Sequence, residues 1–205
     1  MSTYGTMQNR IADEIDRTDL SSQAALAIIS AIKHYASSEL WFKENRFTTD
    51  TVPDTEYYAL PSDMIDIKSI RLSDGATDDD WVPIQRTHEY MDEHYTNPNN
   101  YTGYPRDYSV YDQMLRFGPV PDRTFTIALS MTQELSELSA TADSNGWMTH
   151  GEETIRARAK WDLYTNIIKD FGEADRMKAV EIEAFQRLEA RSEKYTSTGK
   201  TRGRL

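Results

Sequence analysis

The two ends of the chain place hydrophobic residues at the spacing of amphipathic helices. Met7, Ile11 and Ile15 recur at every fourth position, which predicts a short helix over residues 6–17. Three further segments carry apolar residues at helical spacing, namely residues 22–42, 152–172 and 173–194. Gly172 is expected to end the third helix, since glycine is common just beyond a helix C-terminus. The pattern therefore predicts two helices at each end of the chain.

From about residue 46 the period shortens to two, which is typical of strands with one buried face. Residues 124–131 alternate apolar and polar side chains in this way. Residues 108–111 and 114–117 are predicted to pair as a hairpin across the turn that joins them. The middle of the chain is therefore expected to form a sheet.

More strands and one short helix are predicted in the first half of this middle region. Strands are expected at residues 47–49 and 57–60, joined by a turn, and around residues 65–72. The helix is expected at residues 87–95, with Thr87 as its N-cap.

Together these elements predict an α+β fold, a helical bundle of about four helices with an inserted antiparallel β domain. The helical core domain is expected to comprise residues 1–45 and 145–195, the β domain residues 46–132, and residues 196–205 an extended basic C-terminal tail. A small sheet needs large side chains to bury enough area. The predicted β-domain core consists of Trp41, Phe47, Tyr58, Leu60, Ile70, Phe117 and Phe125.

Composition narrows the function classes. The 205 residues are 38% hydrophobic and 28% charged, which is enough apolar material for a core but a lean amount. The absence of Cys excludes disulfides, thiolate catalysis and thiolate metal sites. No run approaches the roughly 18 apolar residues of a membrane helix, and the N-terminal residues lack the features of a secretion signal. We therefore expect no membrane partner and synthesis in the cytoplasm.

The net charge of −11 is unevenly distributed. Residues 194–205 carry four basic residues and no acid, so the other 193 residues carry −15. Such an acidic body repels nucleic acid, which argues against sequence-specific DNA binding. On composition alone, the basic tail is interpreted as a frayed, solvated terminus.

The residues that could carry chemistry do not form a catalytic or metal-binding pattern. His88 and His94 are six residues apart, about 240° around a helix, so their imidazoles would point away from each other. The acidic clusters, such as Glu181 with Glu183, are expected to lie solvated in loops or on polar helix faces. No glycine-rich phosphate loop is complete. We expect no catalytic residues, no metal and no cofactor.

Several short motifs follow one another in a fixed order over roughly residues 8–190. In order they are WF at 41–42, FTTDTV at 47–52, YALPSDM at 58–64, IKSIRL at 67–72, GYP at 103–105, YSVY at 108–111, LRFGPVPD at 115–122, FTIAL at 125–129 and NGWMT at 145–149. Each motif alone is weak, but the whole order at these spacings is fairly specific. In this respect the chain resembles the head–tail adaptor, or connector, proteins of tailed bacteriophages.

The resemblance implies a structural virion protein that is not an enzyme. Such a protein forms a ring, here expected to be a dodecamer, below the portal, connects capsid to tail and lines the DNA channel. The implied partners are the portal protein, a tail or nozzle protein and further copies of the chain, while packaged DNA passes through without specific binding. Family members bind the portal through their C-terminal tails. The corresponding residues here are Thr196, Ser197, Thr198, Gly199, Lys200, Thr201, Arg202, Gly203, Arg204 and Leu205.

Three alternatives stay open at this point. The first is another component of the same neck, a gatekeeper or tail-completion protein. A hydrolase with an acidic pair is the alternative from a different class. A helical regulator that binds protein or DNA would need a basic helix face, which the sequence lacks.

Overall fold

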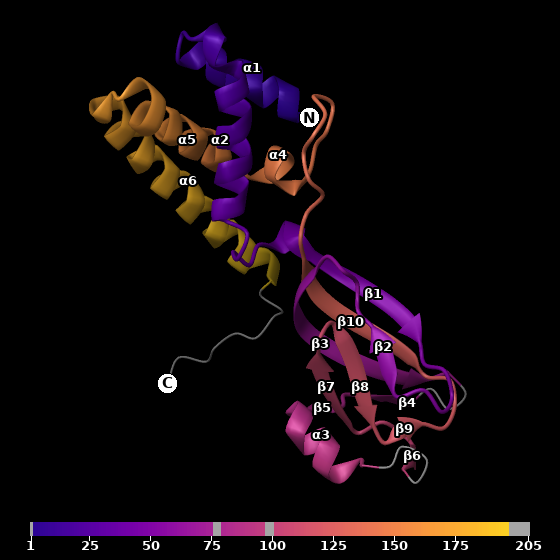
Figure 1. Ribbon diagram of the computed structural model, residues 1–205. Coiled ribbons are helices and arrows are strands. Elements are labelled where there is room, and N and C mark those ends of the chain that lie inside the picture. The colour runs from indigo at the N-terminus through magenta and orange to yellow at the C-terminus, as the bar shows by residue number, and fades with distance from the viewer. Residues whose placement is uncertain (1, 76–78, 97–100, 197–205) are drawn as a thin grey trace, which may run out of the picture. The chain divides into compact units, whose positions relative to one another are not determined.

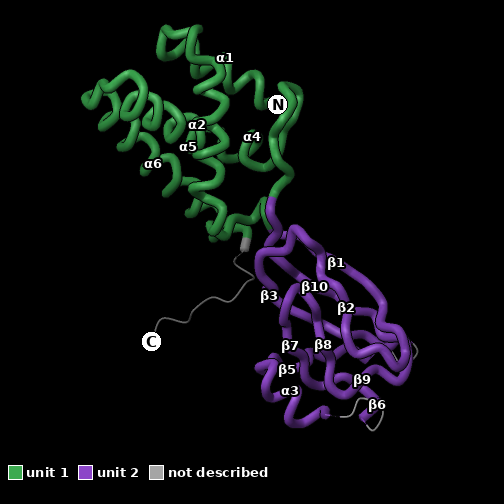
Figure 2. Tube along the Cα trace, viewed as in Figure 1, with its two compact units in different colours: residues 1–43, 135–205 green, residues 44–134 purple. Residues whose placement is uncertain are grey.

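The chain folds into two compact units. In the computed structural model, which describes residues 2–75, 79–96 and 101–196, residues 1–43 and 135–205 form a helical unit and residues 44–134 form a β unit (Figure 2). The β unit begins two residues earlier and ends two residues later than the sequence predicts. The protein is thus of mixed α+β class, as expected.

The helical unit contains one more helix than predicted. Five α-helices lie in its described part, and a π-helical turn, Leu163–Ile168, joins the last two (Figure 1). The α-helices are α1 (Tyr4–Glu14), α2 (Ser21–His34), α4 (Gly146–His150), α5 (Glu152–Asp162) and α6 (Phe171–Thr196), with 3-10 turns at Thr18–Leu20 and Trp41–Lys43. The additional helix is α4, whose N-cap Asn145 accepts a 3.0 Å hydrogen bond from the backbone of Trp147.

One apolar core holds the helical unit together. Met7 and Ile11 of α1, Ile28 of α2 and Ile155 of α5 are fully buried in it. Their side chains come from the helical stripes that the sequence shows. Trp147 of α4 is 2% exposed and belongs to the same cluster.

The helix α2 ends at His34, eight residues before its predicted end. Lys43, one residue beyond that predicted end, is 2% exposed. Its Nζ donates hydrogen bonds to the carbonyl oxygens of Ala36 and Ser38. These bonds satisfy the backbone of the turn that follows the helix, so the helix does not need to continue.

The predicted end of the third helix was wrong. Lys169, not Gly172, ends it, with a left-handed backbone at φ 62°. Asp170 then accepts a 3.1 Å hydrogen bond from the backbone of Glu173 and thereby begins α6. Gly172 lies in the first turn of α6.

The described residues of the β unit form two four-stranded sheets and one two-stranded sheet. The first has the order β1–β10–β3–β4 and the second the order β2–β8–β7–β5, while β6 pairs with β9. The strands are β1 (Glu44–Asp50), β2 (Tyr57–Ala59), β3 (Met64–Asp74), β4 (Asp79–Trp81), β5 (Ile84–Gln85), β6 (Thr102–Gly103), β7 (Asp107–Tyr111), β8 (Met114–Gly118), β9 (Val120–Pro121) and β10 (Thr126–Gln133). Most neighbours are antiparallel, but β5–β7 and β6–β9 are parallel, which the sequence did not predict.

The hairpin prediction was confirmed, whereas two other strands separate. The strands β7 and β8 pair across Asp112 and Gln113, whose φ values of 50° and 56° are those of a tight hairpin turn. The strands β1 and β2, predicted to be joined by a turn, pair with β10 and β8 in different sheets. Helix α3 (His88–His94) begins as predicted, since the Thr87 side chain accepts from the backbone of Tyr90.

A single apolar cluster joins the two larger sheets. Leu60, Ile70, Phe117 and Phe125 are buried in it. Phe47 and Tyr58 are partly buried against it.

The seventh residue predicted for this core, Trp41, lies elsewhere. It precedes the β unit and packs, partly buried, against the core of the helical unit. Its ring lies 5.1 Å from that of Phe42 and 5.2 Å from that of Tyr195, so aromatic partners within the helical unit hold it there. The assignment of Trp41 to the β core was therefore wrong.

Candidate functional site

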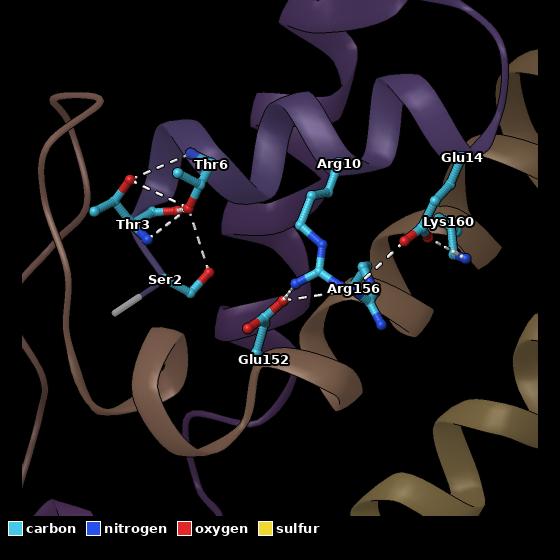
Figure 3. Close-up of polar contacts among 8 residues, drawn as sticks. All are labelled: Ser2, Thr3, Thr6, Arg10, Glu14, Glu152, Arg156 and Lys160. Atoms are coloured by element: carbon cyan, nitrogen blue, oxygen red, sulfur yellow. Dashed lines mark hydrogen bonds and ion pairs between the residues drawn. The ribbon is translucent and has the colours of Figure 1, made fainter.

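A network of opposite charges joins α1 to α5 (Figure 3). Arg10 on α1 pairs with Glu152 at the start of α5, and Glu14 accepts from Lys160 at 2.7 Å. Arg156 lies 3.5 Å from Glu14 and 3.4 Å from Glu152, so the pairs form one network. Exposed ion pairs contribute about 0.2–1 kcal/mol each. The network therefore helps to hold α1 against α5, and its carboxylates are paired with arginine and lysine side chains.

Glu181 of α6 is the centre of a buried polar cluster. It is 1% exposed, accepts a 2.5 Å hydrogen bond from Tyr35 Oη, and pairs with Lys178 at 3.0 Å and Arg158 at 3.4 Å. Burial and the hydrogen bond to Glu181 raise the pKa of Tyr35, which keeps its phenol protonated as a donor. The prediction that the acidic pair with Glu183 is solvated was therefore wrong for Glu181. Its carboxylate is a structural acceptor.

In the β unit, Arg116 is the centre of a buried cluster of charged side chains. Although 5% exposed, it donates to Glu56 and to Asp92 at 2.5 Å each, and its guanidinium lies 5.5 Å from the ring of Tyr57. Asp92 belongs to α3, so this arginine attaches that helix to β8. Such a buried charge is tolerated because carboxylates surround it.

The histidines of α3 make separate stacking contacts. His88 stacks on Tyr111 with ring centroids 4.7 Å apart, and His94 stacks on Tyr90 at 3.9 Å. Within the ranges that the structure describes, no three His, Cys, Asp or Glu side chains gather closely enough to hold a metal ion.

The segment predicted to bind the portal begins at the end of α6. Thr196 is the last residue of that helix, so this position is helical and not extended. The remaining predicted residues, 197–205, lie outside the described part of the chain. Just before them, Tyr195 stacks on Trp41, and the guanidinium of Arg191 lies 4.9 Å from the Trp41 ring. The sequence did not predict this grouping, because Trp41 and α6 lie far apart along the chain.

Apolar side chains are exposed in both units. Those in the described helical unit are Leu26, Ile167, Phe171, Ile182 and Tyr195. Those in the described β unit are Val52, Tyr57, Ile65, Val82, Ile84, Tyr101, Tyr104 and Tyr111. In addition, the outer strands β1, β2, β4 and β5 each pair on one side only among the described strands. Open strand edges and exposed apolar residues are typical of proteins that contact other chains.

Within the described residues, no helix combines the length and the apolar character needed to cross a bilayer.

Comparison with known proteins identifies one relationship. A family model described as SU10 adaptor protein matches residues 2–204, so the match extends over both units. No curated protein matches the chain.

Proposed function

We propose, because this chain belongs to the SU10 adaptor protein family of phage head–tail adaptors, that it forms a ring below the portal, connects the capsid to the tail and lines the DNA channel. As a phage adaptor it is a structural component of the virion that interacts with other virion proteins. The finer assignments of ring, portal and channel are our proposal. The observation that carries them is the family match over residues 2–204.

Two properties of the chain support assembly into a ring. Among the strands that the structure describes, both larger sheets of the β unit have open edges, and both units expose large apolar residues. A ring requires two different surfaces on each subunit, so that every copy contacts the next in the same way. We propose a dodecamer in which the β unit contacts neighbouring subunits or the tail protein below.

The charge distribution supports a channel function. The body carries −15 outside its last twelve residues, and an acidic wall repels the phosphates of packaged DNA. Because DNA that is not bound can slide, we propose passage without specific binding. The basic segment 196–205, in contrast, is proposed to bind the portal.

Mixing the purified full-length protein with purified portal rings tests this function. We expect a ring of adaptor subunits on the portal in cryo-electron micrographs, with the helical unit and the β unit both ordered. A protein that joins the particle only after another neck protein has bound would instead be a gatekeeper or tail-completion protein. A protein that leaves the portal bare under all conditions would contradict the proposal.

A further inference from the structure

A small pocket lies between α6 and the first turn of α5, beside the end of α4. It has a volume of about 140 Å³, and His150, Glu153, Arg187, Leu188 and Arg191 are among its lining residues. Pockets for drug-sized ligands or cofactors occupy roughly 300–1,000 Å³. The size therefore suits a single side chain or a similarly small group.

Arg191 is held at this pocket by aromatic rings. Its guanidinium carbon lies 4.9 Å from the ring centroid of Trp41 and 5.7 Å from that of Tyr195, and these two rings stack on each other. An arginine that stacks on rings keeps the N–H donors at the edge of its guanidinium plane available. The stacking thus orients the donors without consuming them.

Arg191 has no carboxylate partner among residues 2–75, 79–96 and 101–196. The other arginine of the pocket, Arg187, pairs with Glu153 at 3.1 Å and lies 3.9 Å from Glu183. Most arginines in the described part of this acid-rich chain are similarly paired, so an oriented arginine without an acid is an exception there. It offers the donor set that binds carboxylates in bidentate geometry.

The remaining lining fits the same type of ligand. Burial, and then the charge of Arg191, lowers the pKa of His150, so near neutral pH the positive charge comes from the arginines. Glu153 neutralises one of them, and the pocket keeps one positive charge on a body of −15. Leu188 and Ala184 supply apolar wall, which a methylene stem can contact.

We propose that this pocket binds a glutamate or aspartate side chain of an acidic segment in a partner protein, with Arg191 as the principal donor. The proposal rests on the proposed function only in taking that partner to be another virion component. The aromatic pair of Trp41 and Tyr195 orients the arginine, and Leu188 contacts the stem of the acidic side chain.

Peptide binding to the free full-length protein tests the pocket separately from ring assembly. The probe is a fluorescein-labelled hexapeptide of alternating glutamate and leucine, and its glutamine counterpart is the neutral control. We expect saturable binding of the acidic peptide that weakens with salt, and no binding of the neutral one. Arg191→Ala should weaken binding about tenfold, through loss of a charge-assisted bidentate contact.

Two further variants separate the role of Arg191 from general effects. Arg176→Ala removes an exposed arginine of the same helix that pairs with Glu173, and binding should stay unchanged. Arg191→Lys keeps the charge but loses the planar donor geometry, so we expect an intermediate affinity. The thermal unfolding temperature of each variant shows whether it is folded.

Four results would overturn the proposal. These are no binding of the acidic peptide, equal binding of the neutral peptide, unchanged affinity in folded Arg191→Ala, and tighter binding of a thymidine hexanucleotide, which would indicate a phosphate site. Self-association of the free chain that Arg191→Ala reverses, without peptide binding, would assign the pocket to a second copy and would equally contradict it. Failure to assemble on the portal would leave the peptide measurement intact, so the two proposals fail independently.

Discussion

The phenol oxygen of Tyr35 donates a 2.5 Å hydrogen bond to Oε1 of Glu181 across 146 positions of sequence. This bond connects the turn after α2 to the middle of α6, and so joins the N-terminal and C-terminal parts of the helical unit. Tyr35 is 7% and Glu181 1% exposed, so neither group can replace its partner with water while the core stays closed.

Replacing Glu181 with alanine should destabilise the protein strongly. The substitution leaves the hydroxyl of Tyr35 and the cations of Arg158 and Lys178 without their shared acceptor. Removing one partner of a buried ion pair costs roughly 3–5 kcal/mol, and we expect about 3 kcal/mol because Lys178 is partly exposed. Urea unfolding measures the loss. Glu183→Ala, at a side chain that is 73% exposed, is the matched control and should change stability by less than about 0.5 kcal/mol.

Stability should fall at alkaline pH. Burial and a hydrogen bond to Asp107 raise the pKa of Tyr95 to about 12, and burial with the bond to Glu181 raises that of Tyr35. Tyrosine in an unfolded chain ionises near pH 10. Between about pH 10 and 12 the unfolded state therefore loses protons that the folded state keeps, and the free energy of unfolding decreases as pH rises. Urea unfolding at a series of pH values up to 11 measures this slope.

The Tyr95→Phe variant isolates one source of that slope. Without the raised pKa, its free energy of unfolding should decrease less steeply above pH 10 than that of the wild type. Tyr111→Phe changes a tyrosine that is 64% exposed and should keep the wild-type slope. Identical slopes in all three proteins would show that other groups cause the alkaline loss.

Arg116→Met should loosen α3 from its sheet. The change leaves Glu56 and Asp92 without the guanidinium that they share, and we expect a loss of about 3 kcal/mol in the free energy of unfolding. Amide hydrogen exchange that is faster than in the wild type in α3, but unchanged in β10, would locate the effect in that helix. Arg71→Met, at a side chain that is 60% exposed and pairs with the exposed Asp80, should have little effect. Unaltered exchange in α3 would mean that Arg116 does not anchor the helix.

Deleting residues 196–205 should abolish attachment to the portal and leave the fold intact. The deletion removes one terminal residue of α6 and none of the buried residues in either core. Circular dichroism and thermal unfolding should match the wild type, while co-sedimentation with portal rings is lost. Undiminished co-sedimentation of the truncated chain would refute the role of this segment.

Helices and strands that are determined by interactions between residues close in sequence could be predicted from the sequence. Thr87 caps α3 within three residues of itself, and the hairpin between β7 and β8 is fixed by the two residues of its turn. The stripe of Met7 and Ile11 likewise indicates both a helix and its buried face. In these cases the interactions that determine the structure lie within a few positions of one another.

Features that depend on distant partners could not be predicted in the same way. Nothing near Glu181 indicates that it is buried, because two of its partners, Tyr35 and Arg158, lie 146 and 23 positions away. Strand β1 was recognisable, but its pairing with β10 instead of β2 is set by a segment about 80 residues later. Trp41 was assigned to the β core because of its large side chain, but it packs against Phe42 and Tyr195 of the helical unit, and Tyr195 is distant in sequence.

The pairing of β1 with β10 places the incoming and outgoing strands of the β unit side by side, with Glu44 opposite Thr132. Because the two ends of the β unit are neighbours, the two points of the helical unit between which it is inserted stay close together, whatever the length of the insertion. The closure entropy of such a loop grows only slowly as residues are added. A helical scaffold interrupted in this way can therefore accept a longer, shorter or different β module between Lys43 and Leu135, so that the contact surface can diversify while the scaffold stays the same.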